Sequence, residues 1–218
     1  MEYKAVLFDL DNTLMDRDKT FENYCDRVIG RYMPDAAEAR KREAKAFLIE
    51  KDEGGYGARE PLYEGFARGF CPSCAVEELY REWYSMPREC YVPMTGLYAF
   101  LDALARRVPM GVITNGSEIT QTNKVDALGI RGYFQTILIS GALAMAKPDA
   151  RIFHLACERL GVLPGEAVFV GDHFVNDIEG AANAGLQPIW LARNPAEGGA
   201  FETVPSLAAV AETLGFTI

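Results

Sequence analysis

Two aspartates, Asp9 and Asp11, stand one residue apart directly after the apolar run 5–8, and Thr13 follows them. Like charges this close repel each other, and burying them in apolar surroundings is costly. A carboxylate can attack phosphorus as a nucleophile, and a second one can protonate the leaving oxygen and then activate water. We therefore predict that Asp9 acts as the nucleophile and Asp11 as the acid/base of a phosphoryl-transfer reaction.

Polar residues also follow three later apolar runs of the chain. Because the carboxyl ends of parallel strands meet at one edge of a sheet, we expect these residues to gather around the two aspartates. The candidates are Thr114, Asn115 and Gly116 after the second run, Lys147 some residues after the third, and Asp172, His173 and Asp177 after the fourth.

The charges of this set favour a hard divalent cation. Four carboxylates, those of Asp9, Asp11, Asp172 and Asp177, face a single ammonium, that of Lys147. Carboxylate oxygens suit Mg²⁺, which often bridges to a substrate phosphate. With Mg²⁺ bound, the Thr114 hydroxyl, Lys147 and the backbone N–H groups near Asn115 and Gly116 could hold phosphoryl oxygens.

The elements that must position these residues follow an alternating pattern. Short apolar runs predict buried strands at 5–8, 110–114, 136–140, 167–171 and 188–192. Helical patterns lie at 97–104, 118–128, 149–160 and 176–184, and Gly129, Gly161 and Gly185 follow the last three. Continuous apolar strands that alternate with helices indicate an α/β fold with a parallel sheet covered on both faces.

Residues 17–92 interrupt this alternation. They contain helical patterns near 18–32, 36–51, 60–69 and 75–85 and no convincing strand. We expect a core domain made of 1–16 and 93–218, with 17–92 inserted as a helical cap that sets specificity. Most aromatic residues of the insert are expected to form its own core. Arg59, close to the glycine-rich turn 54–57, is the candidate substrate-binding cation of the insert.

Composition excludes several classes of protein. The 218 residues are 49% hydrophobic and 24% charged, which is typical of a globular protein. The net charge of −9 argues against binding a nucleic acid polymer. No apolar stretch reaches the ~20 residues of a membrane span, and the N-terminus lacks the layout of a signal peptide. We expect a cytoplasmic monomer or homodimer whose five cysteines, including the CPSC pair Cys71 and Cys74, are free thiols.

The segments DLDNT, ITNG, KPD and GDHFVND, in this order, resemble the four motifs of the haloacid dehalogenase-like (HAD) hydrolase superfamily, subfamily I with a helical cap. The resemblance covers essentially the whole chain. It implies a Rossmann-like core and a Mg²⁺-dependent phospho-aspartyl mechanism. It also implies that Asp9, the backbone carbonyl of Asp11 and Asp172 bind the metal, with Asp177 in its outer shell, and that Thr114 and Lys147 hold the phosphoryl group.

The second acidic residue of the first motif, Asp11, is absent from the dehalogenases of the superfamily and therefore favours a phosphatase. The stretches 113–130 and 147–162 are similar to the nucleotidase and acylneuraminate-phosphate phosphatase branch. This similarity implies a small phosphorylated substrate such as a nucleoside 5′-monophosphate or a sugar phosphate. His173 stands where small or polar residues are common in the family, so it could adjust the rim of the site.

Other functions share parts of this pattern. A phosphomutase or a 2-haloacid dehalogenase could use the same fold. A phosphomutase would be identified by transfer of the retained phosphoryl group to a second hydroxyl, and a dehalogenase by release of halide without a metal. A phospho-aspartate signalling domain also combines acidic residues, Thr, Lys and Mg²⁺, but such domains are much shorter and their acidic pair is adjacent. A non-catalytic relic of a phosphatase is a further alternative. It is disfavoured because every expected reactive residue is present.

Overall fold

The computed structural model describes residues 2–192 and 200–218. Its contacts divide the chain into two compact units. The core unit consists of Met1–Asp16 and Pro93–Ile218, and the helical unit consists of Arg17–Val92.

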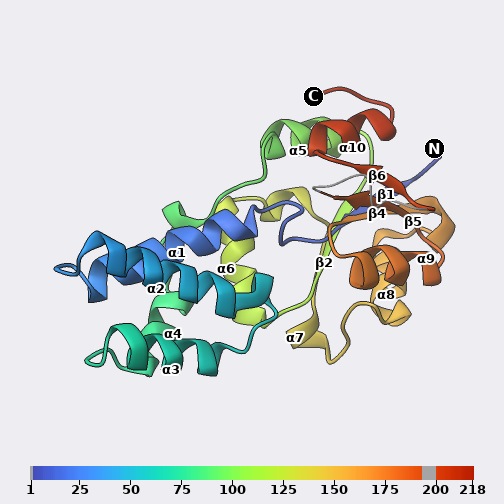
Figure 1. Cartoon of the computed structure of the whole chain (residues 1–218). Helices are drawn as coiled ribbons and strands as arrows, with labels where there is room; N and C mark the ends of the chain where they lie inside the picture. The colour runs from blue at the N-terminus through green and yellow to red at the C-terminus, as the bar shows by residue number, and fades with distance from the viewer. Residues whose placement is uncertain (1, 193–199) are drawn as a thin grey trace. The chain divides into compact units, whose positions relative to one another are not determined.

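One parallel sheet forms the centre of the core unit, with the strand order β3-β2-β1-β4-β5-β6 (Figure 1). The strands are β1 (Ala5–Phe8), β2 (Met110–Thr114), β3 (Thr136–Ile139), β4 (Ala167–Gly171), β5 (Gln187–Leu191) and β6 (Glu202–Val204). Phe8 lies opposite Val112 of β2 and Val170 of β4. This register brings the residues that follow β1, β2 and β4 to the same edge of the sheet.

Helices cover both faces of the sheet, because successive side chains of a strand point to opposite faces. Leu7 packs in a buried cluster with residues of α8 (Ala150–Leu160) and α9 (Gly180–Asn183). Phe8 instead meets Phe100 edge to face at 5.8 Å. Phe100 belongs to α5 (Leu97–Ala105), which lies with α10 (Leu207–Thr213) on the other face (Figure 1). The strands are therefore buried on both sides, as their continuous apolar sequences predict.

Further elements of the core unit lie along the chain between these. They are α6 (Glu118–Leu128), α7 (Ser140–Leu143), the 3-10 turns η3 (Arg131–Tyr133) and η4 (Pro164–Glu166), and the π-helix η5 (Phe174–Glu179). The start of α6 is fixed by Ser117, whose hydroxyl accepts a hydrogen bond from the backbone N–H of Thr120. The helix ends at Gly129, which adopts a left-handed conformation with φ of 69°.

The helical unit has its own core. It comprises α1 (Arg17–Tyr32), α2 (Glu38–Asp52), η1 (Glu53–Gly55), α3 (Arg59–Phe70), α4 (Val76–Tyr84) and η2 (Arg88–Cys90). Tyr24, Tyr63 and Phe66 are completely buried, and the Tyr24 ring meets Trp83 edge to face at 5.1 Å. Tyr56 and Tyr84, in contrast, are exposed.

The predicted α/β class is correct, and the five predicted strands appear within a residue or two of their expected bounds. Three elements were not predicted: β6, α7 and α10. The predicted helix 176–184 differs as well, because the chain first forms the wider turn of η5 and then the short helix α9. This wider turn places Asp177 directly against Gly171.

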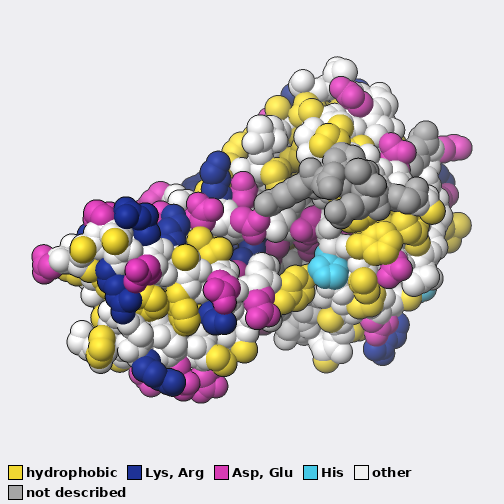
Figure 2. Space-filling model, in the orientation of Figure 1, with side chains coloured by type: hydrophobic (Ala, Val, Ile, Leu, Met, Phe, Trp, Pro, Cys, Tyr) yellow, Lys and Arg dark blue, Asp and Glu magenta, His cyan; other side chains and the backbone are white. Residues whose placement is uncertain are grey.

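All five cysteines are free thiols, and all are buried. No helix of the described residues is both long enough and apolar enough to cross a membrane. On the face shown in Figure 2, basic side chains are interspersed with acidic ones. The net charge of the whole chain is −9.

The close approach of β4 to η5 yields a first prediction. A Cβ atom at Gly171 would lie 2.5 Å from the Cβ, Cγ and Oδ2 atoms of Asp177. The substitution Gly171→Ala should therefore lower the free energy of unfolding by about 1–3 kcal/mol through overpacking. Urea unfolding monitored by circular dichroism measures this change.

The matched control is Gly132→Ala, because a Cβ atom at Gly132 meets nothing within 4 Å. This variant should change the free energy of unfolding by less than about 0.5 kcal/mol. Equal effects of the two substitutions would contradict the prediction.

Candidate active site

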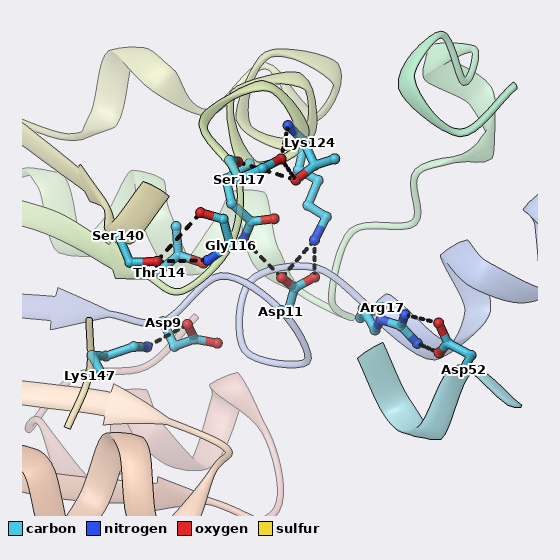
Figure 3. Close-up of polar contacts among 12 residues, drawn as sticks. Asp9, Asp11, Arg17, Asp52, Thr114, Gly116, Ser117, Lys124, Ser140 and Lys147 are labelled. Carbon is cyan, nitrogen blue, oxygen red and sulfur yellow. Dashed lines mark hydrogen bonds and ion pairs between the residues drawn. The ribbon is translucent and has the colours of Figure 1, made fainter. Parts of the chain in front are cut away.

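Asp9 lies at the carboxyl end of β1, where its backbone N–H donates to the carbonyl of Val170 at 2.9 Å. Its side chain is almost completely buried, with 6% of the residue exposed. Lys147, which is also buried, donates from Nζ to Asp9 Oδ1 at 2.6 Å (Figure 3). The same Nζ atom lies 2.7 Å from Asp177 Oδ1. One ammonium therefore lies between carboxylates that come from β1 and from η5.

Three carboxylates converge at this point. Asp9, Asp172 and Asp177 offer oxygen atoms that all lie within 4.8 Å of one another. Burial raises the pKa of Asp9 to about 7, against the opposing effect of Lys147. Burial, together with the charges of Asp9 and Asp177, raises the pKa of Asp172 to about 8. Burial alone would lower the pKa of Lys147, but the Asp177 and Asp9 carboxylates outweigh it and raise that pKa.

The donor set of this cluster fits a hard divalent cation. It consists of carboxylate oxygens, which are the ligands that Mg²⁺ prefers. Asp177 Oδ1 is buried, and no described residue gives it a hydrogen bond of good geometry, although Lys147 Nζ is close. When all three carboxylates are ionised, their negative charges exceed the single positive charge of Lys147.

Asp11 is held by helix α6. Lys124 Nζ lies 2.7 Å from both carboxylate oxygens of Asp11. Gln121 Nε2 donates to Asp11 Oδ2 at 2.9 Å and to the hydroxyl oxygen of Thr114 at 2.5 Å. Thr114, the last residue of β2, is itself buried. The carboxylate of Asp11 and the hydroxyl of Thr114 are thus linked through one amide group.

The loop after β1 curls tightly enough to present both aspartates. The carbonyl of Leu10 accepts hydrogen bonds from the backbone N–H groups of Thr13, Leu14 and Met15. Asn12 adopts a positive φ of 54°, a conformation that Asn tolerates better than most residues. The buried side chains of Leu10 and Leu14 anchor the loop in the core.

Asn115 and Gly116 take part in fixing other parts of the site. The side-chain amide of Asn115 donates to the carbonyl of Lys147 and accepts from the backbone N–H of Lys147, both at 2.9 Å. The backbone N–H of Gly116 donates to the hydroxyl of Ser140 at 3.0 Å. Asn115 therefore orients Lys147, and Ser140 holds the turn that follows β2.

His173 begins η5. Its Nδ1 accepts a hydrogen bond from the backbone N–H of Asn176 at 3.1 Å. Its own backbone N–H donates to Asp177 Oδ2 at 3.0 Å, so it helps to orient that carboxylate.

Arg59 belongs to the helical unit, where its Nη1 atom lies 2.8 Å from Asp52 Oδ1. Arg17 also pairs with Asp52, which is buried. The Arg59 guanidinium lies over the Trp83 ring, 4.2 Å from its centroid. The structure thus gives the predicted substrate-binding cation an ion-pair partner and an aromatic partner within its own unit.

The side chains of Gln121, Lys124, Ser140 and Trp190 contact predicted site residues of the core unit but were not predicted from the sequence. Trp190 donates from Nε1 to the carbonyl of Asp172 at 2.8 Å. Gln121 and Lys124 are three residues apart on the helix that directly follows the Thr114 motif, but their shared partner Asp11 is 110 and 113 residues away in the sequence. Nothing local to Ser140 or Trp190 in the sequence indicates their contacts.

Comparisons with known proteins identify the family of the chain. The family profile described as haloacid dehalogenase-like hydrolase matches residues 6–191. A phosphoserine phosphatase of Thermus thermophilus is 38% identical over 87% of this chain and 89% of its own length. A pyrimidine 5′-nucleotidase of Escherichia coli is 36% identical over 88% of this chain and 87% of its own length. A human N-acylneuraminate-9-phosphatase is 28% identical over 88% of this chain and 83% of its own length.

Solved structures show the same fold. A magnesium-bound HAD hydrolase of Bacillus subtilis covers 99% of this chain and matches all of its own chain, with a TM-score of 0.77 at 20% sequence identity. A HAD phosphatase of Thermococcus onnurineus has a TM-score of 0.69 at 25% identity, again over 99% of this chain and all of its own. The chain belongs to the haloacid dehalogenase-like hydrolase family and, within it, is related to the phosphatases.

Proposed function

We propose that this protein is a Mg²⁺-dependent phosphatase that hydrolyses small phosphorylated metabolites through an aspartyl phosphate formed on Asp9. The observation that carries the proposal is the buried cluster of Asp9, Asp172 and Asp177 around the ammonium of Lys147. Such a cluster has the parts that phosphoryl transfer requires, which are mainly a positioned nucleophile and neutralisation of charge.

In the first step, a carboxylate oxygen of Asp9 attacks phosphorus, and the bond from phosphorus to the leaving oxygen breaks. The protonated carboxyl of Asp11 donates its proton to that oxygen, so the product leaves as an alcohol. Lys147 and the hydroxyl of Thr114 are available to bind phosphoryl oxygens, since both lie at the edge of the sheet from which Asp9 projects.

In the second step, water attacks the phosphorus of the aspartyl phosphate. The Asp11 carboxylate, now without its proton, accepts a proton from that water. The bond from phosphorus to Asp9 breaks, inorganic phosphate forms, and both carboxyl groups return to their initial states. The same residue therefore serves as the acid and then as the base.

Asp9 and Asp172, with the backbone carbonyl of Asp11, would hold Mg²⁺, and Asp177 would support it from the outer shell. The bound ion would supply positive charge that offsets the phosphoryl oxygens and the surrounding carboxylates. The cluster of three carboxylates and its raised pKa values support this assignment.

The substrates that we propose are nucleoside 5′-monophosphates or sugar phosphates, and the helical unit would act as the cap that selects among them. The similarity of the chain to a nucleotidase and to an acylneuraminate-phosphate phosphatase supports this class. The helical unit contains exposed aromatic side chains, those of Tyr56 and Tyr84, besides its own buried core. These could stack on a base or cover a sugar.

The substitution Asp9→Asn tests the nucleophile. It should lower kcat by about 10³-fold or more, because the amide cannot form the covalent intermediate. Phosphate release is measured on a panel of nucleotides, sugar phosphates and phosphorylated acids, with Mg²⁺ or with EDTA. Glu158→Gln, which removes an exposed charge on α8, is the control and should retain full activity.

If the wild-type enzyme with Mg²⁺ released no phosphate from any member of the panel, the proposed function would be wrong. If activity persisted in Asp9→Asn, a different nucleophile would have to be sought.

Metal binding should also show a characteristic pH dependence. The pKa values of Asp9 and Asp172 are raised in the metal-free protein, so their protonated forms favour folding. The stability that depends on those protons is fully present below pH 3.8, the ordinary pKa of an Asp carboxyl, and is lost progressively as pH rises from there to about 7 to 8. In EDTA, the melting temperature should therefore fall between pH 6 and pH 9, and Mg²⁺ should raise it more at pH 9 than at pH 6.

Thermal unfolding with and without Mg²⁺ measures this pH dependence. A Mg²⁺ concentration of about 100 times Kd should raise the free energy of unfolding by about 2.7 kcal/mol. A second readout is the fluorescence of Trp190, whose indole contacts the Asp172 carbonyl, in a Trp83→Phe background that leaves no other tryptophan. The variant Asp172→Asn should lose most of both responses. Undiminished responses in Asp172→Asn would place the metal elsewhere.

A further inference from the structure

The proposed mechanism gives Gln121 no role, yet its side-chain amide lies between two residues of the site. Nε2 of Gln121 carries two hydrogens, and it has two acceptors: Asp11 Oδ2 at 2.9 Å and Thr114 Oγ1 at 2.5 Å. The residue is 1% exposed. A buried amide with both hydrogens used fixes the distance between its two acceptors.

Lys124 contributes the second constraint on Asp11. Its Nζ atom lies 2.7 Å from each of the two carboxylate oxygens, and the residue is 7% exposed. Gln121 and Lys124 are three residues apart on α6, so their side chains project from the same side of the helix. In Figure 3, Asp11 accordingly points toward Lys124, whereas Asp9 points toward Lys147.

The two aspartates of the first motif are therefore separated. Among the described residues, the carboxylates gathered within 4.8 Å are those of Asp9, Asp172 and Asp177, and Asp11 is outside this group. Gln121 and Lys124 together contact both oxygens of the Asp11 carboxylate, and replacing Lys124 removes two of these contacts.

We propose that Gln121 and Lys124 are positioning residues for the acid/base: they hold the Asp11 carboxylate beside Thr114, where the phosphoryl group is expected to bind. This inference rests on the phosphatase function proposed above. Neither residue needs to touch the substrate, because each acts through Asp11.

The Gln121 contact also sets the direction of the Thr114 hydrogen bond. The hydroxyl oxygen of Thr114 accepts from Gln121, so its own hydrogen is left to donate to another acceptor. A phosphoryl oxygen is an acceptor only, which matches this polarity. The same amide thus orients the acid/base and presets the hydroxyl that would bind the phosphoryl group.

A different role for Lys124 would give a different result. A lysine that bound the phosphoryl group directly would contribute equally to every phosphate ester and to product binding. A lysine that positions the acid matters most when the leaving oxygen is a poor leaving group and needs the proton, as in an alkyl phosphate. It matters little for p-nitrophenyl phosphate, whose leaving group departs without a proton.

The experiment compares kcat/KM of Lys124→Met on the best alkyl phosphate of the panel and on p-nitrophenyl phosphate. We expect a loss of about 30-fold or more on the alkyl phosphate, a part of the 10²–10⁴-fold that general acid catalysis supplies. On p-nitrophenyl phosphate the loss should be less than about 3-fold, and inhibition by inorganic phosphate should change by less than about 2-fold. Gln121→Leu should show the same selectivity with a smaller loss on the alkyl phosphate.

Two further variants test whether Lys124 acts through Asp11. In an Asp11→Asn background, adding Lys124→Met should lower kcat/KM by less than about 2-fold, because effects on one functional unit are not additive. Lys124→Arg should recover much of the activity on the alkyl phosphate, since a guanidinium can pair with both oxygens of a carboxylate. Asp126→Asn, which removes an exposed charge of α6, is the control for the helix and should behave as wild type.

Equal losses on both substrates, weaker inhibition by phosphate, or additive effects with Asp11→Asn would overturn the proposal. Melting temperatures of all variants identify a variant that fails to fold, in which case Lys124→Arg and Gln121→Leu carry the comparison. Absence of wild-type activity on every substrate would instead refute the phosphatase function itself, so the two failures are distinguishable.

Discussion

The rest of the site depends on the ion pairs that the Lys147 ammonium makes with Asp9 and Asp177. Burying three carboxylates at one edge of a sheet is unfavourable unless positive charge is supplied. Lys147 lies within 2.7 Å of oxygens from both Asp9 and Asp177, and thereby joins β1 to η5. It does not neutralise the cluster, because one positive charge faces three carboxylates. The remaining imbalance is what makes a divalent cation a chemically reasonable occupant.

Much of the surrounding structure serves to keep that lysine in place. Asn115, at the end of β2, binds both polar groups of the Lys147 backbone, so the lysine is positioned by a neighbouring strand. Gly171, at the end of β4, has no side chain and lets Asp177 approach. Trp190 of β5 holds the carbonyl of Asp172. Hydrogen bonds from Asn115 and Trp190 and close packing at Gly171 thus let three strands shape the site.

The sequence was sufficient to predict the elements whose signals are local. Continuous apolar strands and the helix-ending Gly129 each reflect contacts within a few residues, and the structure contains both. β6 and α10 were missed because each is short: three residues in β6 and seven in α10. Lys124 was missed for a different reason. Its partner Asp11 is 113 residues away in sequence, and a lysine on a helix is ordinarily a solvated residue.

The division of the chain into two units explains why the residues of the proposed reaction were easier to predict than the substrate. All the residues of the proposed reaction belong to the core unit, where the ends of parallel strands fix their positions. The helical unit balances its own buried charge, since Asp52 pairs with Arg17 and Arg59 there. The charge of the core site is in turn balanced by Lys147 of the core unit. We propose that side chains of the helical unit can change without altering that charge balance. Recognition of the leaving group can vary in this way while the machinery that transfers the phosphoryl group is retained.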